Sequence, residues 1–261
     1  RWVLAHELVH YVQFQQTAGA RIAAAVPDST DGRYVQRSVI EGTAVAATDA
    51  YIAAHAPDLP PNAAVYQDLD RALTPGSIAW HYNRAYIEGR EYAVAQAAGP
   101  KAFGTLYDDP PRTSEQVIHD LPPTAEVPQP LNLTTGGDEW QAAATDRLGE
   151  AFVRTALAAN LSVERASRAA AGWGNDSLVT FRRPDGGASS YAWVLRWDTA
   201  SDADEFAAAL GDSLSARGTA LDDGGWQVAG VHAALHRPAA RTTVLVAGTD
   251  GFVDETAVTA A

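Results

Sequence analysis

The stretch RWVLAHELVHYVQFQQ, residues 1–16, decides how the rest of the chain is interpreted. Its apolar residues recur every three to four positions, which predicts a helix, and we expect that helix to cover 1–25. His6 and His10 are one turn apart on one face, so their imidazoles can converge on one Zn²⁺. Glu7 points away from that ion but can reach a water bound to it. This is the arrangement of a metal-activated hydrolase in which the glutamate is the general base.

The residues around the two histidines are apolar, which predicts that the helix is buried. A buried helix carrying two histidines and a glutamate needs partners for these polar groups. The alternative interpretation is that His6 and His10 are ordinary core histidines with satisfied hydrogen bonds.

A third ligand is expected on a second long helix, over residues 31–57, which contains SVIEGTAVAATDAY. Glu41 is an ionisable residue in an apolar run, and a carboxylate there is costly unless it is paired or bound to metal. The small residues after it would let two helices approach closely. The alternative is an ion pair with Arg37, one turn earlier on the same face. Thr48 and Asp49 are candidates to accept the histidine N–H groups.

HELVH followed by Glu41-Gly-Thr-Ala resembles the gluzincin metallopeptidases. YIEGREYAVA, LYDDPPRTSEQVIH and the later GWGNDSLVTF are similar to a metallopeptidase-like family of halophilic archaeal secreted surface proteins. The resemblance implies that His6, His10 and Glu41 hold zinc and that Glu7 is the general base. It also implies a peptide or protein substrate, and a location outside the cell or at its surface.

Two features depart from the gluzincin pattern. Val45 stands where the thermolysin-like branch has an aspartate that orients a histidine. The sheet that usually precedes the HExxH helix is missing, and there is no Met at position 1. We therefore expect further sequence upstream, through which the protein could be anchored.

A zinc hydrolase also needs a hydrogen-bond donor for the oxyanion of its intermediate. Tyr86 and His119 are the first candidates, followed by His81 and Tyr82. Each of these side chains could equally be a half-buried aromatic with its polar tip in water.

Acidic residues outnumber basic ones by 32 to 19, giving a net charge of −13, and Lys101 is the only lysine. This composition is typical of halophilic archaeal proteins; the alternative is a mildly acidic protein from a high-GC organism. Without a basic cluster, we expect no binding to nucleic acid. No apolar run is long enough to predict a transmembrane helix. The absence of cysteine excludes disulfides and thiolate ligands.

The predicted fold is α+β: a helical, zincin-like metallopeptidase domain over 1–120, a proline-rich connector over 121–137, and a C-terminal domain over 138–261. In the C-terminal domain we expect helices over 139–161 and 162–173, then a small antiparallel ββαββ sheet with a PDGG turn in its first hairpin, and a short helix at 252–261. His232 and His236 are also four residues apart, but on a predicted strand they are too far apart to share an ion.

The sequence thus predicts a zinc-dependent peptidase. The alternative is an inactive peptidase scaffold with a structural zinc, acting in binding or in cell-surface structure.

Overall fold

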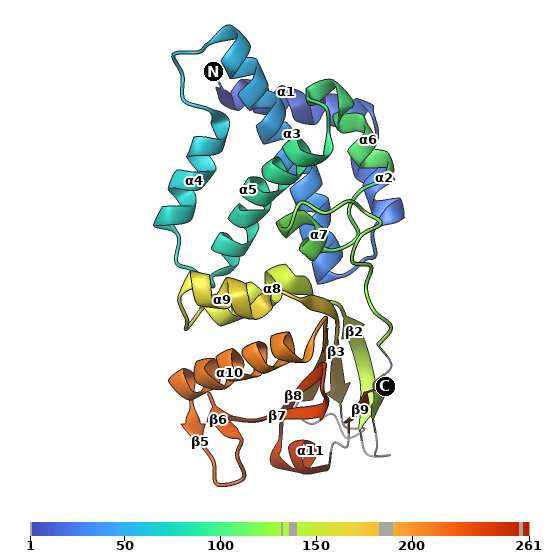
Figure 1. Cartoon of the computed structure of the whole chain (residues 1–261), viewed down its shortest axis with the longest axis vertical. Helices are drawn as coiled ribbons and strands as arrows, with labels where there is room; N and C mark the ends of the chain where they lie inside the picture. Colours follow the sequence, from blue (N-terminus) through green and yellow to red (C-terminus); the bar gives the residue numbers. More distant parts are fainter. Residues whose placement is uncertain (1, 132, 136–139, 183–189, 256–257, 261) are drawn as a thin grey trace. The chain divides into compact units, whose positions relative to one another are not determined.

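The computed structural model describes all residues except 1, 132, 136–139, 183–189, 256–257 and 261 (Figure 1). The chain forms two compact units, Arg1–Val127 and Pro128–Ala261, and the division falls within the predicted connector. The first unit is helical, and the second combines helices with an antiparallel sheet, as expected for a mixed α and β protein. None of the described helices is long and apolar enough to cross a membrane.

The first unit consists of short and long helices joined by turns. Its helices are α1 (Trp2–Gln15), α2 (Ala18–Ala25), α3 (Thr30–His55), α4 (Asn62–Ala72), α5 (Ile78–Gln96), a 3₁₀ turn (Pro100–Ala102), α6 (Phe103–Asp108) and α7 (Ser114–Ile118).

Helices α3 and α5 cross at two glycines and form the centre of this unit (Figure 1). A Cβ built on Gly42 would lie 2.0 Å from the carbonyl carbon of Gly89, so the two backbones are in direct contact. The small residues after Glu41 therefore permit a close helix crossing, as the sequence predicted. On one side of the crossing lies an apolar core that α2, α6 and α7 complete, including Ile22, Val39 and Tyr92.

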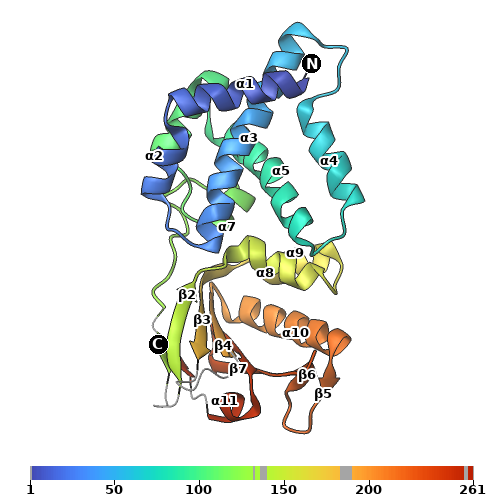
Figure 2. The same ribbon diagram turned by 180° about the vertical axis from the view of Figure 1, so that it is seen from behind.

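Helix α1 lies across α3, as the view from behind shows (Figure 2). The expected single helix over 1–25 is wrong, because Thr17 has a φ of 52° and separates α1 from α2. The prediction that α1 is buried by its apolar residues is also wrong. Leu4, Leu8 and Phe14 are 66%, 56% and 77% exposed, whereas His6 and Gln13 are buried. The face of α1 that packs on the unit is a polar strip.

The second unit is built on a sheet of seven antiparallel strands in the order β2-β3-β4-β8-β7-β6-β5, with a separate pair formed by β1 and β9. Its strands are β1 (Leu133–Thr135), β2 (Gln141–Asp146), β3 (Trp173–Arg182), β4 (Ser190–Trp197), β5 (Thr219–Ala220), β6 (Trp226–Val228), β7 (Val231–Ala239), β8 (Thr242–Gly248) and β9 (Val258–Ala260). Its helices are α8 (Gly149–Ala158), α9 (Val163–Ala170), α10 (Ala200–Arg217) and α11 (Asp250–Glu255).

Three expectations for this unit need correction. The helix predicted over 139–161 is a strand, β2, followed by α8; an alanine-rich sequence favours a helix, but pairing with β3 determines the outcome. The second hairpin of the predicted ββαββ sheet is preceded by a further strand, β6, because Ala229 and Gly230 both have positive φ and form a tight turn between β6 and β7. The terminal helix predicted over 252–261 lies earlier in the chain, as α11 at Asp250–Glu255, and the strand β9 follows it. The PDGG turn lies outside the described residues.

A buried carboxylate joins the sheet of the second unit to α8. Asp176 accepts hydrogen bonds from the backbone N–H groups of Leu148 and Gly149 and from the indole N–H groups of Trp173 and Trp193, at 2.8–3.1 Å. One buried side chain thereby satisfies four donors where the chain enters α8.

Candidate metal centre

Three potential ligand atoms converge where α1 crosses α3. The Nε2 atoms of His6 and His10 are 3.1 Å apart, and Glu41 Oε2 lies 3.5 Å from the first and 3.2 Å from the second. Three ligands at 2.0–2.1 Å from one tetrahedral Zn²⁺ would be roughly 3.3 Å from one another. The three atoms are therefore spaced as a zinc site requires, and they form a group of the kind that can hold a metal ion.

The orientation of His10 is determined by Gln13, one turn further along α1. The Gln13 amide nitrogen donates to the Ile40 carbonyl and to the Thr43 hydroxyl, at 2.8 and 2.9 Å. Its oxygen must therefore face His10 Nδ1, 2.7 Å away, and accept a hydrogen bond from it. With the proton on Nδ1, the Nε2 lone pair of neutral His10 points at the ligand cluster. This is the tautomer that a metal ligand needs.

His6 is held in the same way by a residue of α4. Its Nδ1 lies 3.2 Å from Asn62 Oδ1, and both side chains are buried. Asp49 accepts a hydrogen bond from the Ala63 backbone N–H, next to Asn62, and pairs with Arg90. Asp49 therefore does not accept a hydrogen bond from a histidine, as we predicted. It holds the start of α4, the helix that carries Asn62.

The other residues considered as orienting partners do not contact the histidines. Thr48 is fully buried and its hydroxyl has no partner among the described residues. Val45, where an aspartate would stand in the thermolysin-like branch, is also buried and lines a small cavity beside Tyr66. The side chains that contact the histidine Nδ1 atoms are instead Gln13 and Asn62.

The charges in this site are coupled. Burial raises the pKa of Glu41, but hydrogen bonds with His10 and His6 outweigh it and lower that pKa to about 2. The hydrogen bond with Glu41 raises the pKa of His10 above 6.5, against the effect of burial. Two bare Nε2 lone pairs 3.1 Å apart would repel each other. Without metal, a proton on His10 next to ionised Glu41 relieves this repulsion.

A cavity of about 480 Å³ opens in front of the cluster, lined by Val3, His6, Glu7, His10, Glu41, Tyr66 and Tyr86. Glu7 is exposed and contributes its carboxylate to this cavity. Tyr86 lies beside Glu41, and burial together with that negative charge raises the pKa of Tyr86 to about 12. The phenol therefore keeps its proton near neutral pH and can donate it in a hydrogen bond.

Tyr66, which no pattern in the sequence indicated, lines the same cavity beside Tyr86. Its ring stacks on that of Tyr86, with centroids 4.4 Å apart, and also faces His6 at 6.3 Å. Burial raises the pKa of Tyr66 as well. No local pattern in the sequence marks Tyr66 or Asn62, because both reach the site from α4, a short helix that follows the proline-rich segment 57–61.

The remaining candidates lie elsewhere in the unit. His119 is exposed at the C-terminal end of α7 and is not among the residues that line the cavity. His81 is buried against Tyr34, with ring centroids 4.9 Å apart. The Arg37 guanidinium lies 4.6 Å from the centre of the Tyr82 ring, whereas Glu41 faces the histidines. Of the four candidate oxyanion donors, the cavity contains Tyr86.

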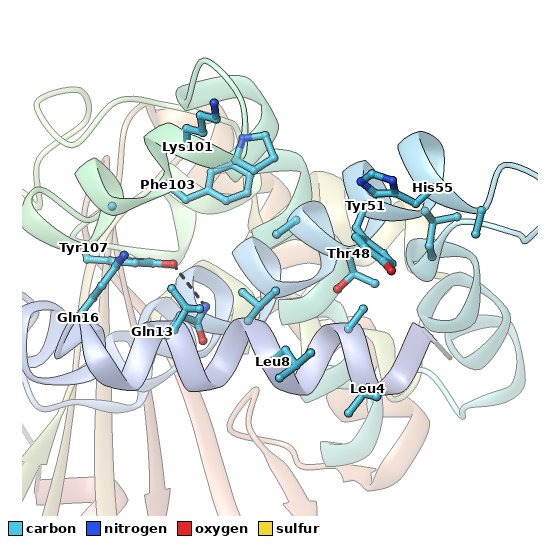
Figure 3. Close-up of a pocket in the computed structure, with 18 of the residues that line it drawn as sticks. Leu4, Leu8, Gln13, Gln16, Thr48, Tyr51, His55, Lys101, Phe103 and Tyr107 are labelled. Atoms are coloured by element: carbon cyan, nitrogen blue, oxygen red, sulfur yellow. Dashed lines mark hydrogen bonds between the residues drawn. The ribbon is translucent and has the colours of Figure 1, made fainter.

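A second, apolar groove of about 690 Å³ runs along the opposite side of α1 (Figure 3). Leu4 and Leu8 of α1 line it from one side, and Thr48 and Tyr51 of α3 from the other. Gln13 also lines the groove, and its amide approaches the Tyr107 hydroxyl at 3.4 Å. Helix α1 thus separates a polar cavity, which contains the ligand cluster, from an apolar one.

The histidine pair of the second unit forms no comparable cluster. His232 and His236 are on β7, as the sequence predicted for a strand. His232 is buried and its Nε2 lies 3.2 Å from Asp223, while His236 is exposed.

Comparisons with known proteins give one match. Residues 138–257 match a family model described as a domain of unknown function, DUF8575. These residues cover most of the second unit and none of the ligand cluster. No curated protein and no solved structure matches the chain.

Proposed function

We propose that the first unit is a zincin-like, zinc-dependent peptidase of the gluzincin type, which hydrolyses peptide bonds in a protein or peptide substrate outside the cell or at its surface. The observation that carries this proposal is the spacing of His6, His10 and Glu41, whose three ligand atoms are 3.1–3.5 Å apart. Their hydrogen-bonded supports, Gln13 and Asn62, leave both Nε2 atoms facing the same point.

A zinc ion held by these three residues would lower the pKa of a bound water and polarise a substrate carbonyl. Glu7 lines the cavity next to the cluster and is in position to take a proton from a water there and later deliver it to the departing amine. Tyr86 lines the same cavity and keeps its proton, since its pKa is about 12; in the metal-free site this proton faces Glu41, and it would be available to a developing oxyanion once that carboxylate binds zinc. The stacked rings of Tyr66 and Tyr86 provide a flat wall on which a substrate backbone can lie.

The test compares the wild-type protein with the variant Glu7→Gln and with a control variant, Gln15→Ala. Gln15 is a suitable control position because it is exposed on the same helix, α1. Zinc content is measured first, followed by cleavage of a mixed peptide library at high salt. We expect one zinc per chain in all three proteins, cleavage by the wild type and Gln15→Ala, and a loss of about a hundredfold or more in Glu7→Gln.

Two results would contradict the proposal. Absence of stoichiometric zinc would mean that the cluster is not a metal site. Full zinc with no cleavage of any peptide would leave the alternative function, an inactive peptidase scaffold in which zinc stabilises the fold.

A further inference from the structure

The second unit contains a cavity of its own, between one face of the sheet and two helices. Its volume is about 440 Å³, which is within the range of roughly 300–1,000 Å³ that small-molecule sites occupy.

The floor of the cavity consists of neighbouring positions on one face of the sheet. Two rows cross the strands in register: Leu178 pairs with Trp193 and Trp193 with Leu245, while Tyr191 pairs with both Thr180 and Ala247. All six residues line the cavity. The floor is therefore continuous over three strands and almost entirely apolar.

The opposite face of the same sheet shows what complete packing looks like in this unit. There Val179, Phe181, Val194 and Val246 form a closed cluster with Phe252 of α11. Each of these residues is at most 6% exposed. The two faces alternate along the same strands, so the cavity is a property of one face and not of a loosely packed domain.

Small side chains create the space. Ala247 and Ala233 are paired on the floor, and Ala156 of α8 lines the cavity from the helical side. Phe152 of α8 and Leu210 of α10 complete the walls. Larger residues at these alanines would fill the gap, and a concave site with a mostly apolar lining suits an apolar ligand.

The cavity opens to solvent beside a positive charge. Tyr191 and Val231 line the cavity and are 38% and 39% exposed, whereas Trp193, Leu245 and Ala247 on the floor are buried. Arg217, the last residue of α10, is exposed and lines the same opening. In a chain with a net charge of −13, a guanidinium at the mouth of an apolar cavity favours a ligand with a negative end.

We propose that this cavity binds a small apolar molecule with one terminal anionic group, such as a medium-chain carboxylate, with its chain between the sheet and α10 and its anionic end at Arg217. This site is independent of the proposed peptidase function. It would belong to the part of the chain that matches the family model for residues 138–257.

The test uses decanoate as the probe and the decyltrimethylammonium cation as its control of the same chain length and opposite charge. Binding to the full chain is measured by calorimetry, with chelator present so that the ligand cluster of the first unit plays no part. We expect one saturable decanoate site per chain and binding of the cation that is about tenfold weaker or more.

Two kinds of variant locate the site. Arg217→Gln should weaken decanoate binding about tenfold, whereas Arg165→Gln, which removes a partly exposed arginine of α9 in the same unit, should leave it unchanged. Ala156→Trp should abolish binding by filling the cavity. Val231→Trp, at an already exposed position, should obstruct the opening without disturbing the interior and keeps the test valid if Ala156→Trp does not fold.

Three outcomes would overturn the proposal. These are the absence of saturable decanoate binding to the wild-type protein, equally tight binding of the cation, and decanoate binding that Val231→Trp and a folded Ala156→Trp leave unchanged.

Discussion

Gln13 Oε1 lies 2.7 Å from His10 Nδ1, and the amide that carries it is anchored to the Ile40 carbonyl and the Thr43 hydroxyl. This contact converts a flexible histidine into one with a fixed tautomer. Side chains that hold a metal ligand in this way typically account for a factor of about 10–100 in metal affinity.

Gln13→Ala should therefore weaken zinc binding about 10–100-fold, because His10 would lose the acceptor that keeps its proton on Nδ1. The measurement is a competition titration with a chromogenic chelator. Gln15→Ala, at an exposed position of the same helix, is the matched control and should bind zinc like the wild type. Equal affinities of Gln13→Ala and Gln15→Ala would show that the 2.7 Å contact does not orient a ligand.

Glu41→Ala should remove one of three ligands and lower zinc affinity by orders of magnitude, and Glu41→Gln should also fail because a neutral amide is a poorer ligand. Thermal melts with and without chelator test this. Chelator should destabilise the wild type and Arg37→Ala but have little effect on Glu41→Ala, since bound metal stabilises only a protein that can hold it. A wild-type melt insensitive to chelator would leave the cluster as a hydrogen-bonded core.

The folding stability of the zinc-free protein should depend on pH differently from that of the zinc-bound protein. The raised pKa of His10 contributes stability that is present below 6.5, its ordinary value, and is lost as pH rises through the raised value. The lowered pKa of Glu41 contributes stability that is present above 4.5 and is lost as pH falls toward about 2. In the zinc-free protein, the His10–Glu41 pair therefore stabilises the fold most between pH 4.5 and pH 6.5, where both contributions are fully present.

Zinc requires neutral histidines, so its stabilising effect should grow as pH rises through the pKa of His10. Melting temperatures with zinc and with chelator, measured from about pH 5.5 to about pH 8, should diverge as pH increases. His10→Ala should abolish this divergence. A constant difference across the range would contradict the coupling between the proton on His10 and the metal.

Asp176→Ala should destabilise the second unit by about 3 kcal/mol, because it leaves four buried N–H donors without their acceptor. Chemical denaturation followed by tryptophan fluorescence measures this directly, since two of the four donors are indoles. Asp222→Ala, at an exposed position, is the control and should have little effect. If both variants unfold at the same denaturant concentration, Asp176 does not hold α8 to the sheet.

Much of the candidate site was predictable from local sequence, and the reason is geometric. His6 and His10 are constrained by one helical turn, and Glu41 was conspicuous as a carboxylate in an apolar run. Asn62 and Tyr66 could not be predicted, because α4 reaches the site through the tertiary packing of a segment rich in proline. Gln13 carried a weak signal, as a polar residue one turn after His10 on the same face.

The fold was predictable where periodicity was strong and failed where neighbouring strands decide the structure. Helix α3, expected over 31–57, spans Thr30–His55. The segment Gln141–Asp146 is alanine-rich and reads as a helix, but it pairs with β3 at the edge of the sheet. The apolar content of α1 predicts burial, but the buried side chains of this helix include His6 and Gln13, and Leu4, Leu8 and Phe14 are exposed.

The outward face of α1 has a consequence for how the protein behaves in solution. Salt screens repulsion among the carboxylates of a chain with a net charge of −13, so melting temperature should rise along a salt series. Salts that are excluded from the protein surface also favour contact between apolar surfaces. The exposed side chains of Leu4, Leu8 and Phe14 present such a surface. Light scattering along the same salt series should therefore record growing self-association as the melting temperature rises. The double variant Leu8→Glu with Phe14→Glu should associate less, while its melting temperature should still rise with salt.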